Sequence, residues 1–384
     1  MKYVYLDHAA TTAVRPEVRE AMAPYFDDRF GNPSSVHRWG RQAKNALEQA
    51  RERVAAALGA KRREIVFTGG GTEADNIAVL GRWRALCDSG SASPICCSAI
   101  EHKAVLSAAK QCTREGGELI ILGVDELGRV QTVAIDEAIR ARPAIISVMW
   151  ANNEVGTIQP IADIAARCQA AGVSFHTDAV QAFGKLRVRV DDVPCDLLSV
   201  SAHKVGGPKG TGALFIRGGV DVSALTHGGG QEREVRPGTE NVACAVGFAI
   251  AAELAAAEQE HEAKRLAGLR DRLQQSLVEN IPDLTVNAAG AERLPNILNV
   301  SIGGADQEAL LIGLDLEGVA ASGASACQSG AVTPSHVLAA MGRVRPGDAT
   351  VRFSLGHTTT AEDIAVAMQA VPAVVRRIRA EVAA

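Results

Sequence analysis

The residues best suited to chemistry lie in the stretch 197–212, which reads LLSVSAHKVGGPKGTG. An apolar run ends there in Ser201, His203 and Lys204, and glycines follow. A lysine at a strand end loses hydration, so its amine deprotonates more easily and can form a Schiff base with an aldehyde. Pyridoxal phosphate fits, because Ser201 and His203 can donate to phosphate oxygens and the glycines allow a close backbone approach. The alternative is a surface lysine in a polar loop.

A second candidate site follows the apolar run 65–67 in the stretch EIVFTGGGTEADNIAVLG. Three glycines end in Gly71, Thr72 follows, and a helical pattern with early acidic residues begins. Free N–H groups and the positive end of a helix dipole favour a phosphate at such a turn. The glycine spacing matches neither a P-loop nor a dinucleotide-binding fingerprint. An ordinary strand-to-helix turn is the alternative.

From Pro94 onward the same alternation of apolar runs and helical patterns repeats, and each run ends in polar residues. This alternation predicts a mainly parallel α/β sheet flanked by helices. Ligands of such sheets bind beyond the carboxyl ends of the strands. The polar residues expected at that edge are His102, Asn153, Asp178, Gln181 and Lys204. Their convergence favours one site over separate surface roles.

The composition changes near residue 251, where a helical stretch rich in Ala, Glu, Lys and Arg runs to about residue 279. We interpret it as the connection to a smaller α+β domain. The prediction is a large domain at 13–257 and a small domain formed by 1–12 and 258–384. Within the small domain we expect strands at 297–302 and 351–355, and helices at 307–314, 334–341 and 361–380. Thr333 and Pro334 are the expected N-cap and first residue of the second of these helices.

Composition excludes several classes of function. The chain has 384 residues, of which 47% are hydrophobic, so it can form a large core. Its formal net charge of -4 gives no overall positive field for nucleic-acid binding. The N-terminal stretch has no apolar signal segment, and no run of roughly 18 apolar residues occurs. We therefore expect no membrane segment and a cytoplasmic location.

The eight cysteines show no Cys-x-x-Cys pair and no spacing typical of metal ligands, so no structural metal is expected. Cys168, Cys195 and Cys244 fall in apolar or helical patterns, which indicates core positions in a reducing compartment. Cys327 differs, because the residues around it are Ala, Ser and Gly.

Taken together, these motifs resemble the NifS-type cysteine desulfurases, which are class-V aminotransferase-like enzymes of the fold-type I pyridoxal phosphate group. The resemblance runs from end to end. It rests on YLDHAATT, FGNPSSVH, FTGGGTEADN, Glu101-His102, ANNEVG, HTDAVQ, SAHKVGGPKGTG, RPGTENV, LPNILNVS, SGASACQSG and VRFSLG. Eleven motifs in this order are specific, although one alone would not be.

The resemblance implies roles for the predicted site. Lys204 would carry the cofactor and act as base, Asp178 would pair with the pyridine nitrogen, and His102 would stack on the ring. Gln181 would reach the 3-hydroxyl and Asn153 would lie near the ring and the substrate. The residues expected around the phosphate are Gly71, Thr72, Ser201, His203 and, from the partner subunit of a homodimer, Thr239.

The resemblance also implies a substrate site and a nucleophile. Arg352 in VRFSLG would clamp the carboxylate of L-cysteine, with assistance from Asn32, although a salt-bridged strand residue and a turn former are the respective alternatives. Cys327 would attack the substrate sulfur, which yields a persulfide and alanine. The sulfur would then pass to an acceptor protein.

The segment around Cys327 departs from the family's usual Ser-Gly-Ser-Ala-Cys-Thr-Ser-Gly, because Ala324 and Gln328 replace hydroxyl residues. Its short arm resembles the branch that serves iron-sulfur assembly, tRNA thiolation and DNA phosphorothioation, and its detail resembles the phosphorothioation enzymes most. Another fold-type I enzyme, such as an aminotransferase or a selenocysteine lyase, would not require Cys327. A non-catalytic scaffold of the same fold would not require Lys204, Asp178 and Arg352.

Overall fold

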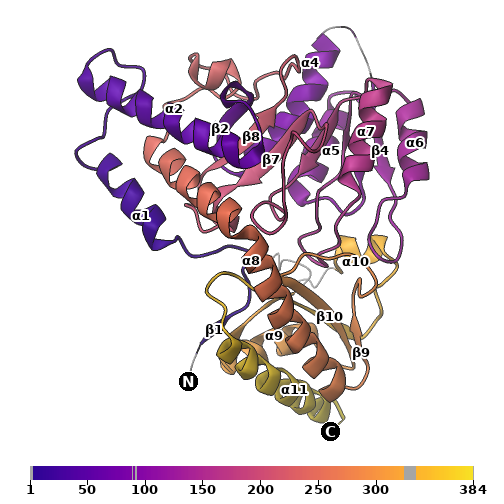
Figure 1. The fold of residues 1–384 in the computed structure, drawn as a ribbon. Helices are drawn as coiled ribbons and strands as arrows, with labels where there is room; N and C mark the ends of the chain where they lie inside the picture. The colour runs from indigo at the N-terminus through magenta and orange to yellow at the C-terminus, as the bar shows by residue number, and fades with distance from the viewer. Residues whose placement is uncertain (1–2, 89, 91–92, 324–333, 384) are drawn as a thin grey trace.

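The computed structural model describes residues 3–88, 90, 93–323 and 334–383 and contains two lobes, each built on its own sheet (Figure 1). The larger sheet has seven strands in the order β2-β8-β7-β6-β5-β3-β4. Strands β4, β3, β5, β6 and β7 run parallel, whereas β8 is antiparallel to both β7 and β2. The strands are β2 (Ile65–Thr68), β3 (Ile95–Ser98), β4 (Leu119–Leu122), β5 (Ile145–Ser147), β6 (Phe175–Asp178), β7 (Leu197–Ser201) and β8 (Gly212–Ile216).

Helices cover both faces of this sheet, and its inner strands β3, β5, β6 and β7 are buried along their whole length. Neighbouring residues of one strand enter different cores: Ile146 packs with the side of the sheet that includes Val54, and Ile145 packs with the side that includes Trp83. The helices of this lobe are α1 (Pro16–Met22), α2 (Arg38–Leu58), α3 (Gly71–Asn76), α4 (Arg82–Asp88), α5 (Lys103–Arg114), α6 (Thr132–Arg140) and α7 (Ile161–Ala171).

The smaller lobe contains a four-stranded antiparallel sheet in the order β12-β13-β10-β9 and a parallel pair of β1 with β11. A separate apolar core, which includes Leu310 and Val371, joins these strands to two helices of this lobe and to the later part of the long helix that connects the lobes. The elements are β1 (Val4–Tyr5), β9 (Leu284–Val286), β10 (Ile297–Gly303), α9 (Gln307–Leu316), β11 (Val319–Ala320), β12 (Ser322–Gly323), α10 (His336–Ala340), β13 (Asp348–Ser354) and α11 (Ala361–Ala383).

The long helix α8 (Val242–Asn280) connects the two lobes (Figure 1). It packs against α1 and α2 in the larger lobe and against α11 in the smaller one. One 18-residue window of α8 is apolar enough to cross a membrane, but half of that window is buried inside the protein. We interpret α8 as a core helix. The predicted division at residue 257 falls within it and stays a prediction.

The fold class is the predicted one, a mainly parallel sheet flanked by helices with a smaller α+β lobe. The predicted start of α10 is wrong. Ser335 is its N-cap and accepts hydrogen bonds from the backbone N–H groups of Val337 and Leu338, so the helix begins after Pro334. Thr333, the predicted N-cap, lies outside the described residues.

Candidate active site

A cavity of about 380 Å³ lies at the carboxyl ends of the parallel strands. Residues from both lobes line it, because Arg352 comes from β13 and most of the others follow strands of the large sheet. The predicted site residues that line this cavity are Gly71, Thr72, His102, Asn153, Asp178, Gln181, Ser201, His203, Lys204 and Arg352. The sheet edge thus brings together residues that are far apart in the sequence.

Lys204 ends the short 3-10 turn that follows β7. Its ammonium donates to the backbone carbonyl oxygens of Ala9 at 2.5 Å and Ala10 at 2.9 Å. Burial, and after it the positive charge of Arg352, lowers the pKa of Lys204 to about 8. A larger share of this amine is therefore uncharged at neutral pH than of an ordinary lysine, which is what a nucleophilic amine requires.

Asp178 is the last residue of β6 and is only 5% exposed. Its Oδ1 accepts a hydrogen bond from the Val180 N–H at 2.8 Å. Burial raises the pKa of Asp178, while His102, that backbone bond and Lys204 act in the opposite direction. A cation placed in the cavity beside this carboxyl group would stabilise its ionised form.

His102 is the N-cap of α5, and its Nδ1 accepts a hydrogen bond from the Ala104 N–H at 3.2 Å. Desolvation at the cavity wall, together with Lys204 and other neighbouring cations, lowers its pKa against the opposing effect of Asp178. The imidazole is therefore neutral at neutral pH. Gln181 also lines the cavity, and its side-chain amide donates to the Ala9 carbonyl oxygen at 2.9 Å.

One end of the cavity offers several groups that suit a phosphate. The Ser201 hydroxyl is buried and has no hydrogen-bond partner among the described residues. Gly70 has a φ of 151°, and a Cβ on Gly71 would lie 2.8 Å from a Val180 methyl group, so this turn favours glycine. Thr72 and His203 complete this end of the cavity wall.

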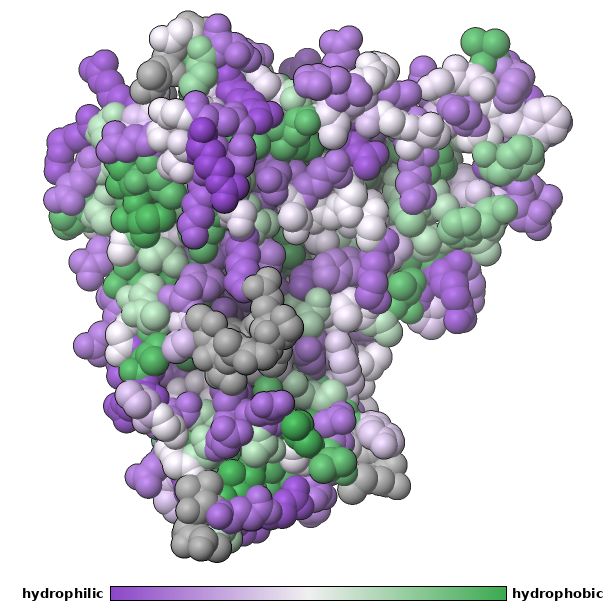
Figure 2. All heavy atoms as spheres, turned by 180° about the vertical axis from the view of Figure 1, so that it is seen from behind, coloured by the Kyte–Doolittle hydropathy of each residue, from purple (hydrophilic) through white to green (hydrophobic). Residues whose placement is uncertain are grey.

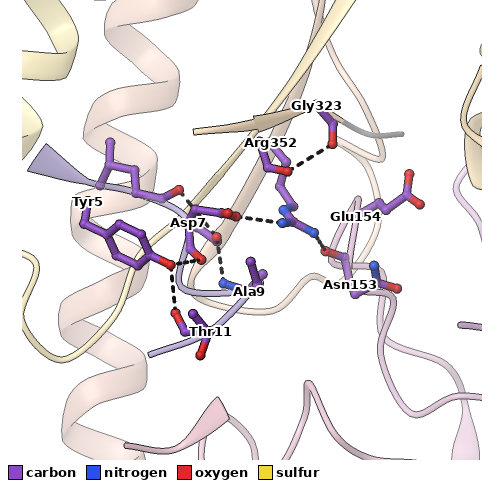
Figure 3. Close-up of polar contacts among 12 residues, drawn as sticks. Tyr5, Asp7, Ala9, Thr11, Asn153, Glu154, Gly323 and Arg352 are labelled. Carbon is purple, nitrogen blue, oxygen red and sulfur yellow. Dashed lines mark hydrogen bonds and ion pairs between the residues drawn. The ribbon is translucent and has the colours of Figure 1, made fainter. Parts of the chain in front are cut away.

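Arg352 is fixed by contacts with two distant segments (Figure 3). Its Nη2 lies 2.7 Å from Oδ1 of Asp7, and its Nη1 donates to the Asn153 carbonyl oxygen at 3.0 Å. The Nε has no partner among the described residues. The single proton of the Tyr5 hydroxyl is shared between the carbonyl oxygens of Asp7 and Thr11, each 3.1 Å away, which anchors the segment that carries Asp7. The ion pair with Asp7 matches the alternative given for Arg352, a salt-bridged strand residue, while its buried Nε–H has no acceptor among the described residues.

Three predicted site residues are not in the cavity wall as described. Asn32 is exposed, and its Oδ1 accepts a hydrogen bond from the Ser34 N–H at 2.9 Å, which is the turn-forming alternative. Thr239 is exposed in the loop before α8. Cys327 lies outside the described residues.

Sequence reasoning missed two acidic residues and one backbone feature. Asp7 was not singled out because its partner Arg352 is 345 positions away, and no local pattern reports such a pair. Asp75 lines the cavity from α3, and its signal was a carboxylate on the buried side of a short helix. The carbonyl groups of Ala9 and Ala10 hold Lys204, and a side-chain motif cannot predict a backbone contact.

A lysine and a buried carboxylate lie at the ends of the adjacent parallel strands β7 and β6 of this mainly parallel sheet. The aminotransferase class-V family matches residues 4–366. The cysteine desulfurase IscS of Dictyoglomus turgidum is 44% identical over 377 residues, which cover 98% of this chain and 95% of that protein.

Solved structures agree with this family. A NifS-like protein superposes with a TM-score of 0.91 at 34% identity and covers 98% of this chain and 100% of its own. DndA from Streptomyces lividans superposes with a TM-score of 0.76 at 36% identity and covers 91% of this chain and 99% of its own. The chain belongs to the IscS and NifS type of cysteine desulfurases, within the class-V aminotransferase family.

Proposed function

We propose that this protein uses pyridoxal phosphate to remove sulfur from L-cysteine, and that it releases L-alanine. The observation that carries the proposal is the single cavity shared by Lys204, Asp178 and Arg352. These residues would supply a nucleophilic amine, a carboxylate for a cationic ring nitrogen and a planar donor for the substrate carboxylate.

The residues present fit this cofactor. The buried Ser201 hydroxyl is an unused donor, and the glycine turn beside Thr72 leaves room for a phosphate. Burial raises the pKa of Asp178, and a protonated pyridine nitrogen facing this carboxyl group would favour its ionised form. When bound, pyridoxal phosphate supplies an electron sink for bond cleavage at the substrate α-carbon.

Each side chain of the site would then have a separate role in the reaction. Lys204 would hold the cofactor, and its uncharged Nζ would take the α-proton of cysteine. Arg352 binds the substrate carboxylate while Asp7 and the Asn153 carbonyl keep its guanidinium in place. The neutral imidazole of His102 would pack against the cofactor ring, Gln181 would donate to its 3-hydroxyl, and Gly71 and His203 would border the phosphate.

We propose that Cys327 is the sulfur acceptor on this chain. Its thiolate attacks the sulfur of bound cysteine, so that a sulfur–sulfur bond forms while the carbon–sulfur bond of the substrate breaks. In sum, the Cys327 thiol and cysteine become a Cys327 persulfide and alanine, and no external oxidant is needed. Among the other cysteines, Cys96 and Cys97 are fully buried in β3, and burial raises the pKa of Cys96 to about 12, which suppresses its thiolate.

We also propose a homodimer in which Thr239 completes the partner's phosphate site. The exposed position of Thr239 supports this arrangement, because it cannot serve its own cavity from there. Large apolar side chains are exposed in the segment that precedes α2: the exposed fraction is 69% for Phe26, 70% for Phe30 and 87% for Val36. Figure 2 shows apolar side chains on the part of the surface that projects at the upper right of that view. Asn32 lies in the same segment, and we propose that it assists substrate binding in the assembled dimer.

The proposed setting is the cytoplasm, where an acceptor protein receives the persulfide sulfur. Iron-sulfur assembly, tRNA thiolation and DNA phosphorothioation are the candidate pathways. The likeness to both an IscS and a DndA supports these pathways as a group.

The test is turnover of L-cysteine by the purified protein loaded with pyridoxal phosphate. We expect alanine and reducible sulfur in equal amounts from the wild type. Lys204→Ala should show neither product, because anchor and base are lost together. Lys209→Ala, a change to an exposed lysine in the same loop, is the matched control and should retain turnover. Wild-type turnover by Lys204→Ala would contradict the proposal.

A further inference from the structure

A second carboxyl group lies at the Asp178 end of the cavity. Asp75 on α3 is only 1% exposed and lines the same cavity as Asp178. Its Oδ1 accepts no hydrogen bond from any described residue. An ionised carboxylate that is buried without donors is costly, so such a group either gains a partner or takes a proton.

Asp75 lies at one end of a buried row of hydrogen bonds. The Ser147 hydroxyl is 2.8 Å from Nδ1 of His176, and Nε2 of His176 is 3.0 Å from the Ser199 hydroxyl. Ser199 interacts in turn with the Asp75 carboxyl group, and Oδ1 of Asp75 is 3.7 Å from Nε2 of His176. The three partners come from β5, β6 and β7, and each is 0% exposed.

Three buried acids surround this end of the site, and burial raises the pKa of each, that of Glu101 to about 8. Asp75 has neither the two donors of Glu101 nor the facing cations of Asp178. Glu101 accepts hydrogen bonds from the Ser98 hydroxyl at 2.5 Å and from the Met149 N–H at 2.7 Å. Asp178 accepts from a backbone N–H and faces the cations of the cavity.

Burial, and after it the charge of Asp178, raises the pKa of Asp75 well above its usual range, and Glu101 adds to the effect. Burial also lowers the pKa of His176 to about 3, so the imidazole is neutral and supplies no counter-charge. The row therefore offers Asp75 hydrogen bonds but no positive charge.

The row accommodates a neutral Asp75 without loss of a hydrogen bond. If Asp75 is protonated, its hydroxyl donates to Ser199, Ser199 donates to Nε2 of His176, and Nδ1–H of His176 donates to Ser147. If Asp75 is ionised, the direction of each hydrogen bond is reversed. Ser147 then donates to Nδ1 of His176, Nε2–H of His176 donates to Ser199, and Ser199 donates to the Asp75 carboxylate. Both directions need only hydroxyl rotation and the two tautomers of a neutral imidazole.

We propose that Asp75 is a positioning residue, a buried neutral acid at the end of the Ser199–His176–Ser147 row that leaves Asp178 as the single anion facing the cavity there. The consequence for the reaction rests on the proposed cofactor site. A lone Asp178 carboxylate pairs one to one with a cationic ring nitrogen, whereas two adjacent carboxylates would repel each other and would favour protonation of Asp178 itself.

The direct test is the infrared absorption of protonated carboxyl groups in the purified protein at neutral pH. Asp75→Asn should remove one such band, because asparagine is a neutral isostere of the protonated acid. Glu73→Gln, a change on the same helix to a carboxylate that pairs with Arg236, should remove none. A spectrum of Asp75→Asn that keeps every wild-type band would overturn the proposal.

Unfolding at different pH values provides a second test. A proton that the folded protein binds and the unfolded chain releases makes the free energy of unfolding fall as pH rises above the usual pKa of Asp. The free energy of unfolding of Asp75→Asn should fall less steeply with pH than that of the wild type. The unfolding equilibrium constant of the wild type, relative to that of Asp75→Asn, should grow about tenfold per pH unit. Parallel curves for wild type and Asp75→Asn would overturn the proposal.

If Asp75→Asn does not fold, Ser199→Ala replaces it. Loss of the Ser199 hydroxyl should shift the carboxyl band to higher frequency, and an unshifted band would exclude Asp75 as its source. None of these measurements uses cysteine turnover. A protein that fails to release sulfur can therefore still show the Asp75 band, and an active protein can lack it.

Discussion

At the scale of single residues, the site depends on side chains that are fixed before a substrate binds. Arg352 illustrates this, because Asp7 and the Asn153 carbonyl oxygen hold two of its nitrogens and leave Nε free (Figure 3). A planar guanidinium can keep these contacts and still donate to a carboxylate. A lysine ammonium in the same place offers one point charge and cannot do both.

Arg352→Lys should therefore raise the KM for L-cysteine by about 10- to 100-fold, the equivalent of about 1.5 to 3 kcal/mol for a lost charged hydrogen bond. Loading with pyridoxal phosphate, measured by visible absorbance, should stay normal. Asp7→Asn keeps the guanidinium and loosens its support, so its effect should be smaller. An unchanged KM in Arg352→Lys would exclude Arg352 as the substrate clamp.

Several of the cavity residues that sequence reasoning found lie at or just after strand ends. Lys204 and Asp178 each follow an apolar run, and parallel strands bring such ends to one edge. Asp7 could not be found in this way, because its contact with Arg352 depends on how β1 and β13 lie together in the small lobe. The proton on Asp75 is equally invisible in sequence, since it depends on burial and on Asp178.

At the scale of elements, α10 is tied to the active-site loop by one hydroxyl. Ser335 accepts hydrogen bonds from two N–H groups of the first turn of α10, and it donates to Oε2 of Glu154 at 2.5 Å. Burial raises the pKa of Glu154 to about 7, against the opposing effect of this hydrogen bond. Glu154 is next to Asn153, so the cap connects α10 with the residue that supports Arg352.

Ser335→Ala should cost more than an ordinary helix cap, which is worth about 1 kcal/mol. The variant removes the cap and also leaves the buried Glu154 carboxyl group without its donor. Asn241→Ala, which removes the exposed cap of α8, is the matched control. Urea unfolding should show a loss in free energy of unfolding at least about twice that of the control. Equal losses would mean that the Glu154 contact adds nothing.

The same helix shows why element boundaries were harder to predict than element types. Thr333, Pro334 and Ser335 are consecutive, and each is a plausible start signal in sequence. The Ser335 hydroxyl caps the helix and also donates to the Glu154 carboxyl group, 181 positions away, a contact that no local pattern reports. Strand β13 likewise begins three residues before its predicted start, where it pairs with the far end of β10.

At the scale of the whole molecule, we expect the proposed dimer to use the exposed apolar side chains Phe26, Phe30 and Val36. Phe30→Asp puts a charge on a 70% exposed apolar side chain there, so it should convert the protein to a monomer in sedimentation and weaken cofactor retention. Ile312→Asp changes a 53% exposed side chain on α9 and should leave the mass unchanged. A wild-type protein that sediments as an active monomer would contradict the dimer.

The measurement that tests the central claim most directly is the fate of sulfur in Cys327→Ser. This variant should load cofactor and change its visible spectrum on mixing with L-cysteine, because both steps depend on Lys204, Asp178 and Arg352. It should release neither alanine nor sulfide, since a serine oxygen attacks sulfur far less readily than a thiolate. Cys244→Ser, a change to a partly exposed cysteine, should retain wild-type turnover.

In the wild type, radiolabelled sulfur from cysteine should be found on the peptide that contains Cys327, and a thiol should release it. Cys327→Ser should carry no label on any peptide. Sulfide release by Cys327→Ser at a rate comparable to the wild type, or label on another cysteine, would contradict the account even if every cofactor residue were assigned correctly.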